Sequence, residues 1–292
     1  DIQRANALTS DLILAGQTLF LPVLPTGIYG MNSRGEAVLQ LQRVLRSLGY
    51  GLDADGIYGP ETANTIYYIQ LKYPELAADG IYGPQTRTFL QQMVREGYRI
   101  VQNPSDLLAL VNKMHALDPY YLPPDLTVPD IPFTTEGSAP RKQLRAEAAG
   151  ALEQLFARAT AEGIELVGVS GYRSYPRQAV IFQENWEDME RANLFSARPG
   201  ESEHQTGLAI DVSSPSVGGL LTQAFGDTAE GRWLMQNAPD FGFIIRYPSD
   251  KEAVTGYSYE PWHLRYVGRE AAQAISAAGL VLEEYVPRLT QS

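Results

Sequence analysis

Two stretches in the second half of the chain alternate between apolar and polar or small residues. In residues 208–212, Leu, Ile and Val alternate with Ala and Asp211, and in residues 263–267, His263 shares one face with an arginine and a valine. A period of two is typical of a β-strand that packs one face on a core. Both stretches are therefore predicted to be strands, and Asp211 is expected to point away from the core.

Helical spacing dominates the first third of the chain. Residues 38–48 and 62–73 carry apolar side chains three or four positions apart, so each predicted helix has one apolar stripe. The sequence Asp-Gly-Ile-Tyr-Gly-Pro occurs at 55–60 and again at 79–84, and a related Thr-Gly-Ile-Tyr-Gly occurs at 26–30. Gly followed by Pro is typical of a helix start. The pattern predicts a small bundle of three helices.

Each copy of the repeat contains one tyrosine: Tyr29, Tyr58 and Tyr82. Exposed rings could stack on a sugar or a peptide. Alternatively, the rings pack the glycine loops against the helices, which is the interpretation we favour.

The rest of the chain predicts a mixture of helices and strands, and hence an α+β fold with an antiparallel sheet. Gly163 is expected to end a long helix, and several prolines forbid a regular helix between 119 and 132. The acids Glu283 and Glu284 are expected on a solvated helix face. The predicted helices are 104–117 and 141–162, and the predicted strands are 164–169 and 243–247.

We divide the chain into four segments on this basis. A short N-terminal segment, 1–25, precedes the helical domain 26–95. Residues 96–103 are interpreted as a linker, and 104–292 as the α+β domain that carries the chemistry.

Histidines are scarce in this chain, and two of the three lie beside acids in turns marked by glycine or proline. His204 precedes Asp211 by seven positions, and His263 follows Glu260 and Pro261. Two histidines and one aspartate leave a fourth zinc position open for water, as in catalytic zinc sites. We therefore predict Zn²⁺ on His204, Asp211 and His263.

Glu260 is the candidate general base of this site. Pro261 interrupts the strand ladder, so Glu260 can be directed to the same space as His263, where a carboxylate can take a proton from water. Taken singly, each of these residues has a simpler explanation, such as a hydrogen-bonded histidine or an aspartate that caps a turn. The four together favour a metal site.

Composition narrows the possible functions. The chain has 292 residues, a formal net charge of -11 and no cysteine. The negative charge argues against a nucleic-acid partner, because phosphates demand a basic surface. No apolar run is long enough for a membrane span, and disulfides are excluded.

The second half of the chain also resembles a known family. The motifs Ser-Gly-Tyr-Arg-Ser at 170–174, Ser-Glu-His-Gln-Thr-Gly-Leu-Ala-Ile-Asp at 202–211, Gly-Phe-Ile-Ile-Arg-Tyr-Pro at 242–248 and Glu-Pro-Trp-His at 260–263 resemble the VanY-type D-alanyl-D-alanine carboxypeptidases. These are zinc peptidases of the group that includes lysostaphin-like enzymes and the hedgehog fold. The resemblance implies a zinc D,D-carboxypeptidase that removes the terminal D-alanine from peptidoglycan stem pentapeptides.

The same resemblance implies that Arg173, Gln178 and Ser202 belong to the substrate site. Arg173 is expected in a turn between a strand and a helix, a common place for substrate-holding groups. A guanidinium there could bind the terminal carboxylate of a peptide or stabilise an oxyanion. Trp262 could line the substrate pocket or pack in the core.

The N-terminal part resembles two wall-binding modules. Residues 1–25 are similar to the second half of a LysM module, and 26–95 are similar to the peptidoglycan-binding domain found beside many wall hydrolases. The resemblance implies an exported protein of the cell wall, periplasm or extracellular space that binds peptidoglycan through its N-terminal domain.

Three other functions remain open at the level of sequence. An L,D-carboxypeptidase that acts on tetrapeptide stems shares these motifs, and an endopeptidase that cuts inside the stem shares the metal chemistry. A non-catalytic wall-binding protein is the third alternative, against which the intact ligand set and Glu260 argue.

Overall fold

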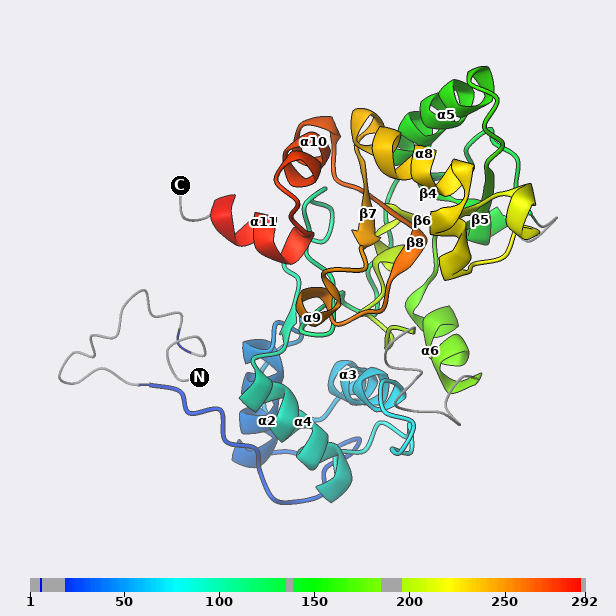
Figure 1. Cartoon of the computed structure of the whole chain (residues 1–292). Helices are drawn as coiled ribbons and strands as arrows, with labels where there is room; N and C mark the ends of the chain where they lie inside the picture. The colour runs from blue at the N-terminus through cyan, green and yellow to red at the C-terminus, as the bar shows by residue number, and fades with distance from the viewer. Residues whose placement is uncertain (1–5, 7–18, 135–138, 185–195, 290–292) are drawn as a thin grey trace. The chain divides into compact units, whose positions relative to one another are not determined.

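A computed structural model describes residues 6, 19–134, 139–184 and 196–289 (Figure 1). The chain divides into two compact units, residues 1–102 with 113–119 and residues 103–112 with 120–292. Most of the LysM-like segment 1–25 lies outside the described residues. None of the helices in the described ranges combines the length and the apolar character needed to cross a bilayer.

The described part of the first unit contains three helices: α2 (Glu36–Ser47), α3 (Pro60–Leu71) and α4 (Pro84–Glu96). α3 and α4 begin at the prolines of the repeat, where a missing N–H costs nothing and the fixed φ suits a helix. The predicted three-helix domain is confirmed.

A buried glutamine explains why the loop sequence is repeated. The amide of Gln42 donates to Asp55 and Thr62 and accepts the N–H of Gly56. Gln70 makes the matching contacts with the second copy of the loop. Each loop is thus fixed to the helix before it by the same set of hydrogen bonds, because a buried amide needs all its partners.

The tyrosines of the repeat pack inward. Tyr58 and Tyr82 are fully buried, and their hydroxyls donate to the carbonyls of Gly80 (2.8 Å) and Pro25 (2.7 Å). Tyr29 is half-buried and stacks on Tyr82 with a centroid distance of 6.0 Å. The packing interpretation is confirmed for Tyr58 and Tyr82.

The segment 96–103 contains a short strand, β1 (Arg99–Ile100), which pairs in parallel with β2 (His115–Ala116). Ile100 is buried in the core of the first unit. Residues 103–112, between these strands, belong to the second unit and form turns.

The predicted helix over 104–117 is therefore wrong, and the reason lies in its carbonyl groups. Those of Leu107 and Ala109 each accept a hydrogen bond from Nη2 of Arg265 at 2.9 Å. In addition, the carboxylate of Asp106 accepts the N–H of Leu108, a local bond that competes with a helix.

A four-stranded antiparallel sheet forms the centre of the second unit, in the order β5-β6-β8-β7. The strands are β5 (Val167–Ser170), β6 (Ala209–Ser213), β7 (Phe243–Tyr247) and β8 (Glu260–Tyr266). The predicted α+β class is confirmed, and the strand predicted over 243–247 agrees with β7.

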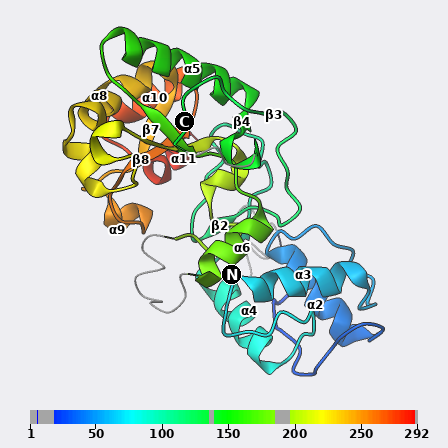
Figure 2. The same ribbon diagram turned by 90° about the vertical axis from the view of Figure 1, so that its right-hand side faces the viewer.

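Helices cover this sheet, and Figures 1 and 2 both show α5 (Ala146–Ala161), α8 (Ala229–Asn237) and α10 (Arg269–Ala277) grouped beside it. Leu152 and Leu155 of α5 pack with Leu234 of α8 against Ile210 and Leu264. The other α-helices described in this unit are α6 (Tyr175–Glu184), α9 (Glu252–Thr255) and α11 (Leu282–Leu289). Short 3-10 helices are η1 (Ala139–Lys142), η3 (Glu203–Thr206), η4 (Pro215–Val217), η5 (Gln223–Asp227) and η6 (Ala238–Phe241).

The helix expected from residue 141 begins five residues later, at Ala146. Residues 144–145 form β4 (Leu144–Arg145), which pairs with β3 (Leu126–Thr127). Just before β4, the carbonyl of Arg141 accepts the N–H of Gly171. Tertiary hydrogen bonds therefore replace the first turn of the predicted helix.

Substitution of Tyr58 tests its structural role. Tyr58→Phe leaves the carbonyl of Gly80 without its donor and is expected to lower the free energy of unfolding of the first unit by about 1 kcal/mol. Tyr58→Ala also removes the buried ring and should cost about 3–5 kcal/mol. Urea unfolding of the whole protein measures both effects.

Tyr67 on α3 is the matched control, since its side chain is exposed. Tyr67→Phe is expected to change stability by less than about 0.5 kcal/mol. Equal effects of the two Tyr→Phe changes would contradict the buried role of Tyr58.

Candidate active site

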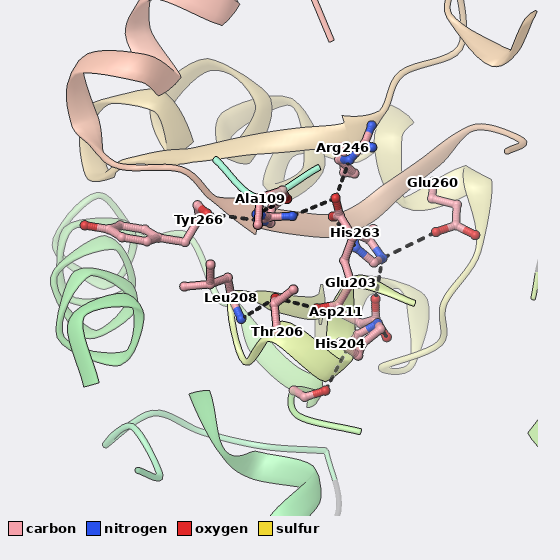
Figure 3. A network of polar contacts seen from close by, with 12 residues as sticks. Ala109, Glu203, His204, Thr206, Leu208, Asp211, Arg246, Glu260, His263 and Tyr266 are labelled. Carbon is pink, nitrogen blue, oxygen red and sulfur yellow. Dashed lines mark hydrogen bonds and ion pairs between the residues drawn. The ribbon is translucent and has the colours of Figure 1, made fainter. Parts of the chain in front are cut away.

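The pairing of β6 with β8 places Asp211 directly opposite His263. Ile210 and Leu264, the paired neighbours, lie in the apolar core on the other face of the sheet. Alternation of side chains thus turns Asp211 and His263 toward the same space, as Figure 3 shows. Both side chains are almost fully buried.

His204 reaches this space from η3, the short helix just before β6. Gly207 ends η3 in the left-handed conformation, with φ of 68°, which glycine adopts without strain. The ring Nδ1 of His204 lies 2.7 Å from the carbonyl oxygen of Gly171. Because a carbonyl can only accept, Nδ1 carries the proton, and Nε2 faces Oδ2 of Asp211 at 3.4 Å.

His263 is held on both sides by carboxylates. Its Nδ1 lies 3.3 Å from Oδ1 of Asp211 and 3.5 Å from Oε2 of Glu260. Its Nε2 lies 3.7 Å from Oε2 of Glu203. Burial lowers the pKa of His263, but the contacts with Asp211 and Glu203 outweigh it and raise the pKa to about 9 in the metal-free protein.

These three side chains fit a divalent metal ion. One ligand atom from each of His204, Asp211 and His263 lies within 4.8 Å of the other two. Burial lowers the pKa of His204, so its neutral Nε2 presents a lone pair to a carboxylate. Two acceptors this close need a cation between them, and two His with one carboxylate are a set that Zn²⁺ accepts.

A buried carboxylate that sequence reasoning did not single out, Glu203, supports the site from behind. Nε of Arg246 and Nη1 of Arg265 both donate to its Oε1, at 2.7 and 2.8 Å. Burial raises the pKa of Glu203, but the two guanidiniums outweigh it and hold that pKa well below its usual range. Its other oxygen faces His263, in the arrangement by which carboxylates orient metal-binding histidines.

The arginine Arg246 has a second partner, which corrects the expectation for Glu283. The two Nη atoms of Arg246 donate to the carboxylate of Glu283 at 2.9 and 2.7 Å. Glu283 therefore anchors α11 to the sheet instead of lying on a solvated face. Glu284 pairs with Lys251.

Glu260 begins β8 opposite Tyr247, where the register of β7 and β8 shifts. Because of this irregularity, Glu260 and His263 turn to the same space although they are three residues apart. Burial raises the pKa of Glu260 to about 7, with His263 opposing the shift. A carboxyl with such a pKa can accept and release a proton near neutrality.

Arg173 leaves the turn after β5 and is fixed by two side chains. Its Nη1 donates to Oε1 of Gln178 at 2.9 Å and its Nη2 donates to Oγ of Ser170 at 3.3 Å. Gln178 also donates to the carbonyl of Ala197. Gln178 is thus placed behind Arg173, where it orients the guanidinium.

Most of the predicted site residues line one cavity of about 640 Å³. Arg173, Ser202, Glu260 and Trp262 line it together with the three candidate metal ligands, whereas Gln178 is not part of its lining. Trp262 both lines the cavity and packs against the core, so the two alternatives for this residue hold together. Tyr247 and Tyr257 close the side next to His263, with the ring of Tyr247 5.0 Å from its imidazole.

Comparison with known proteins identifies the family. Residues 141–269 match the VanY family, described as D-alanyl-D-alanine carboxypeptidase, and residues 34–90 match a putative peptidoglycan binding domain. The putative carboxypeptidase YodJ of Bacillus subtilis is 52% identical over 196 residues, which cover 66% of this chain and 72% of that protein. The chain belongs to the VanY carboxypeptidase family.

Solved structures show the same relationship. The structure of the LdcB LD-carboxypeptidase is 52% identical and has a TM-score of 0.63, over 65% of this chain and 90% of that one. A mutant of the vancomycin resistance D,D-pentapeptidase VanY from the VanB-type cassette, in complex with Zn(II), is 35% identical with a TM-score of 0.52, over 61% of this chain and 98% of that one. The second unit is therefore a peptidase domain of the VanY type.

Glu203→Gln tests whether this carboxylate orients His263. The amide can still accept from the two arginines, but its NH₂ would face Nε2 of His263 and favour the tautomer protonated on Nδ1. That nitrogen faces Asp211, so we expect metal affinity to fall about 10–100-fold. Competition with a chromophoric chelator measures the change.

Glu283→Gln is the matched control, because it removes the same charge beside Arg246 without contacting His263. We expect both variants to unfold at lower denaturant and Glu283→Gln to keep the parent's metal affinity. An equal loss of affinity in both would show that stability alone accounts for the effect.

Proposed function

We propose that this protein is a zinc-dependent carboxypeptidase that removes the C-terminal D-alanine from peptidoglycan stem peptides. The observation that carries the proposal is the buried group of His204, Asp211 and His263 with Glu260 beside it, 3.5 Å from His263. Zinc bound by the three ligands would supply a Lewis acid that activates water and polarises the scissile carbonyl near neutral pH. The crystal structure of a VanY relative is a complex with Zn(II), which supports this choice of metal.

Glu260 is the proposed general base. Its carboxylate takes a proton from the attacking water and delivers it to the amine of the departing D-alanine. The pKa of about 7 that burial produces suits both transfers. The apolar sides of the cavity, including Trp262 and Tyr247, exclude bulk water and strengthen these electrostatic effects.

Arg173 is the proposed anion-binding group of the cavity. Gln178 and Ser170 hold its guanidinium in place, so its donors are pre-organised for a carboxylate or a developing oxyanion. Ser202 lines the same cavity and can donate a hydrogen bond to the substrate.

Two peptide bonds are candidates for cleavage. The sequence resemblance and the VanY family match support D,D-carboxypeptidase activity on a pentapeptide. The relationship to LdcB, at 52% identity against 35% for the VanY D,D-pentapeptidase, favours L,D-carboxypeptidase activity on a tetrapeptide. We give more weight to L,D-carboxypeptidase activity. The identity to LdcB is higher, and both matches cover most of the relative's chain, so the two identities can be compared.

The first unit would hold the enzyme on its polymeric substrate. The match of residues 34–90 to a peptidoglycan-binding domain supports this role. We propose that residues 26–95 bind the wall and 104–292 cleave the stem peptide, and that the protein acts outside the membrane, where peptidoglycan lies.

Mass spectrometry of stem peptides separates the two activities. The zinc-loaded protein is incubated with a pentapeptide or a tetrapeptide, with a chelated sample alongside. We expect loss of the terminal D-alanine from the tetrapeptide, and no reaction after chelation. Trimming of the pentapeptide alone would assign D,D activity, and an internal cut would assign an endopeptidase. Cleavage of neither peptide would favour a binding protein.

Glu260→Gln tests the assignment of the base. Since general acid–base catalysis contributes about 10²–10⁴-fold, we expect kcat to fall by that factor while zinc content stays at the parent's level. Glu270→Gln, an exposed change on α10, should leave kcat unchanged. If Glu260→Gln cleaves as fast as the parent, another group is the base.

A further inference from the structure

A second hollow of about 550 Å³ adjoins the catalytic cavity and shares Arg173 and Ile181 with it. Arg141 and Arg177 line this hollow and do not line the catalytic cavity. Three guanidiniums therefore converge in a protein whose formal net charge is -11. An anion bound in this hollow would be attracted by all three positive charges.

Among the described residues, Arg141 and Arg177 have no acidic partner, and both side chains are exposed. Two other arginines of the same unit do have acidic partners: Arg145 pairs with Asp125, and Arg246 pairs with two glutamates. The guanidinium donors of Arg141 and Arg177 are thus available to a ligand.

Hydrogen bonds through Gly171 connect Arg141 to the candidate metal site. The carbonyl of Arg141 accepts the N–H of Gly171 at 2.7 Å, and the carbonyl of Gly171 accepts Nδ1–H of His204. A Cβ on residue 171 would lie 2.4 Å from the carbonyl oxygen of Gln143, so only glycine permits this approach. Arg177 lies in the first turn of α6, which follows the turn that carries Arg173.

Arg173 separates an acidic space from a basic one. Burial lowers its pKa, Arg141 and Arg177 lower it further, and Asp211 and Glu260 act in the opposite direction. Arg173 thus lines both the cavity that contains Asp211 and Glu260 and the hollow that contains Arg141 and Arg177. A guanidinium cluster of this kind binds carboxylates with strong, directional hydrogen bonds.

We propose that the hollow lined by Arg141 and Arg177 binds a second carboxylate of the peptide substrate, distinct from its terminal carboxylate. This inference rests on the proposed function, because it places a peptide in the catalytic cavity. The terminal carboxylate has Arg173 within that cavity, whereas Arg141 and Arg177 lie outside it. The ligand is thus an acidic side group on the same peptide.

The test uses two synthetic peptides that end in the same D-alanine. They differ at one residue before the scissile bond, which carries either a free carboxylate or a carboxamide. We expect the parent to prefer the carboxylate peptide in kcat/KM, and the double variant Arg141→Gln, Arg177→Gln to lose about tenfold of that preference. Arg288→Gln, an exposed change on α11 that lines neither cavity, should keep the parent's ratio.

Binding affinities measure the same preference for the carboxylate peptide over the carboxamide peptide, and they do not require turnover. Titration calorimetry of both peptides with Glu260→Gln, with and without the two arginine changes, measures binding even if the parent cleaves neither peptide. A fall in affinity for the carboxylate peptide alone supports the inference. An unchanged ratio, an equal loss for both peptides or binding of neither would overturn it, and an equal loss would assign the hollow to the terminal carboxylate.

Discussion

The peptidase domain is built around a carboxylate that is buried together with two arginines. Glu203 has no exposed surface in its side chain, and neither have Arg246 and Arg265. Burial of one such charge alone would cost several kcal/mol, so the three groups must be buried together. They come from η3, β7 and β8, and their hydrogen bonds fix how these elements meet.

This ion cluster lies directly behind the candidate metal ligands. Glu203 precedes His204 in the chain and faces His263 across the sheet, at 3.7 Å from its Nε2. The same carboxylate thus fixes the backbone next to one histidine and the ring of the other. Because Arg265 also holds the carbonyls of Leu107 and Ala109, the segment 103–112 is tied to the same cluster.

Periodicity predicted the parts of the fold in which local and tertiary demands agree. The helices after Gly59 and Gly83 and the strands around Asp211 and His263 follow from spacing alone. The helix expected over 104–117 is absent because two of its carbonyls accept hydrogen bonds from Arg265, which is buried and lies 156 and 158 residues away in sequence; no local pattern predicts such a contact. The role of Glu203 was not predicted for a related reason. Its partners, Arg246 and Arg265, are recognisable only once β7 and β8 are known to be neighbours, although arginines inside apolar strands were a signal that a buried acid was needed.

The charges around the site relate the candidate metal ion to the proposed anionic substrate. Two arginines offset the charge of Glu203, whereas the cationic groups beside Asp211 and Glu260 are Arg173 and the two histidines. A dication between His204, Asp211 and His263 would offset both carboxylates, so the charge of Arg173, which Gln178 and Ser170 hold in place, could pair with an anionic substrate. Arg141 and Arg177, which line the neighbouring hollow with Arg173, then remain as positive charge that no acid among the described residues offsets. A peptide with more than one carboxylate would supply that compensation, and in doing so would be held in register with the metal site.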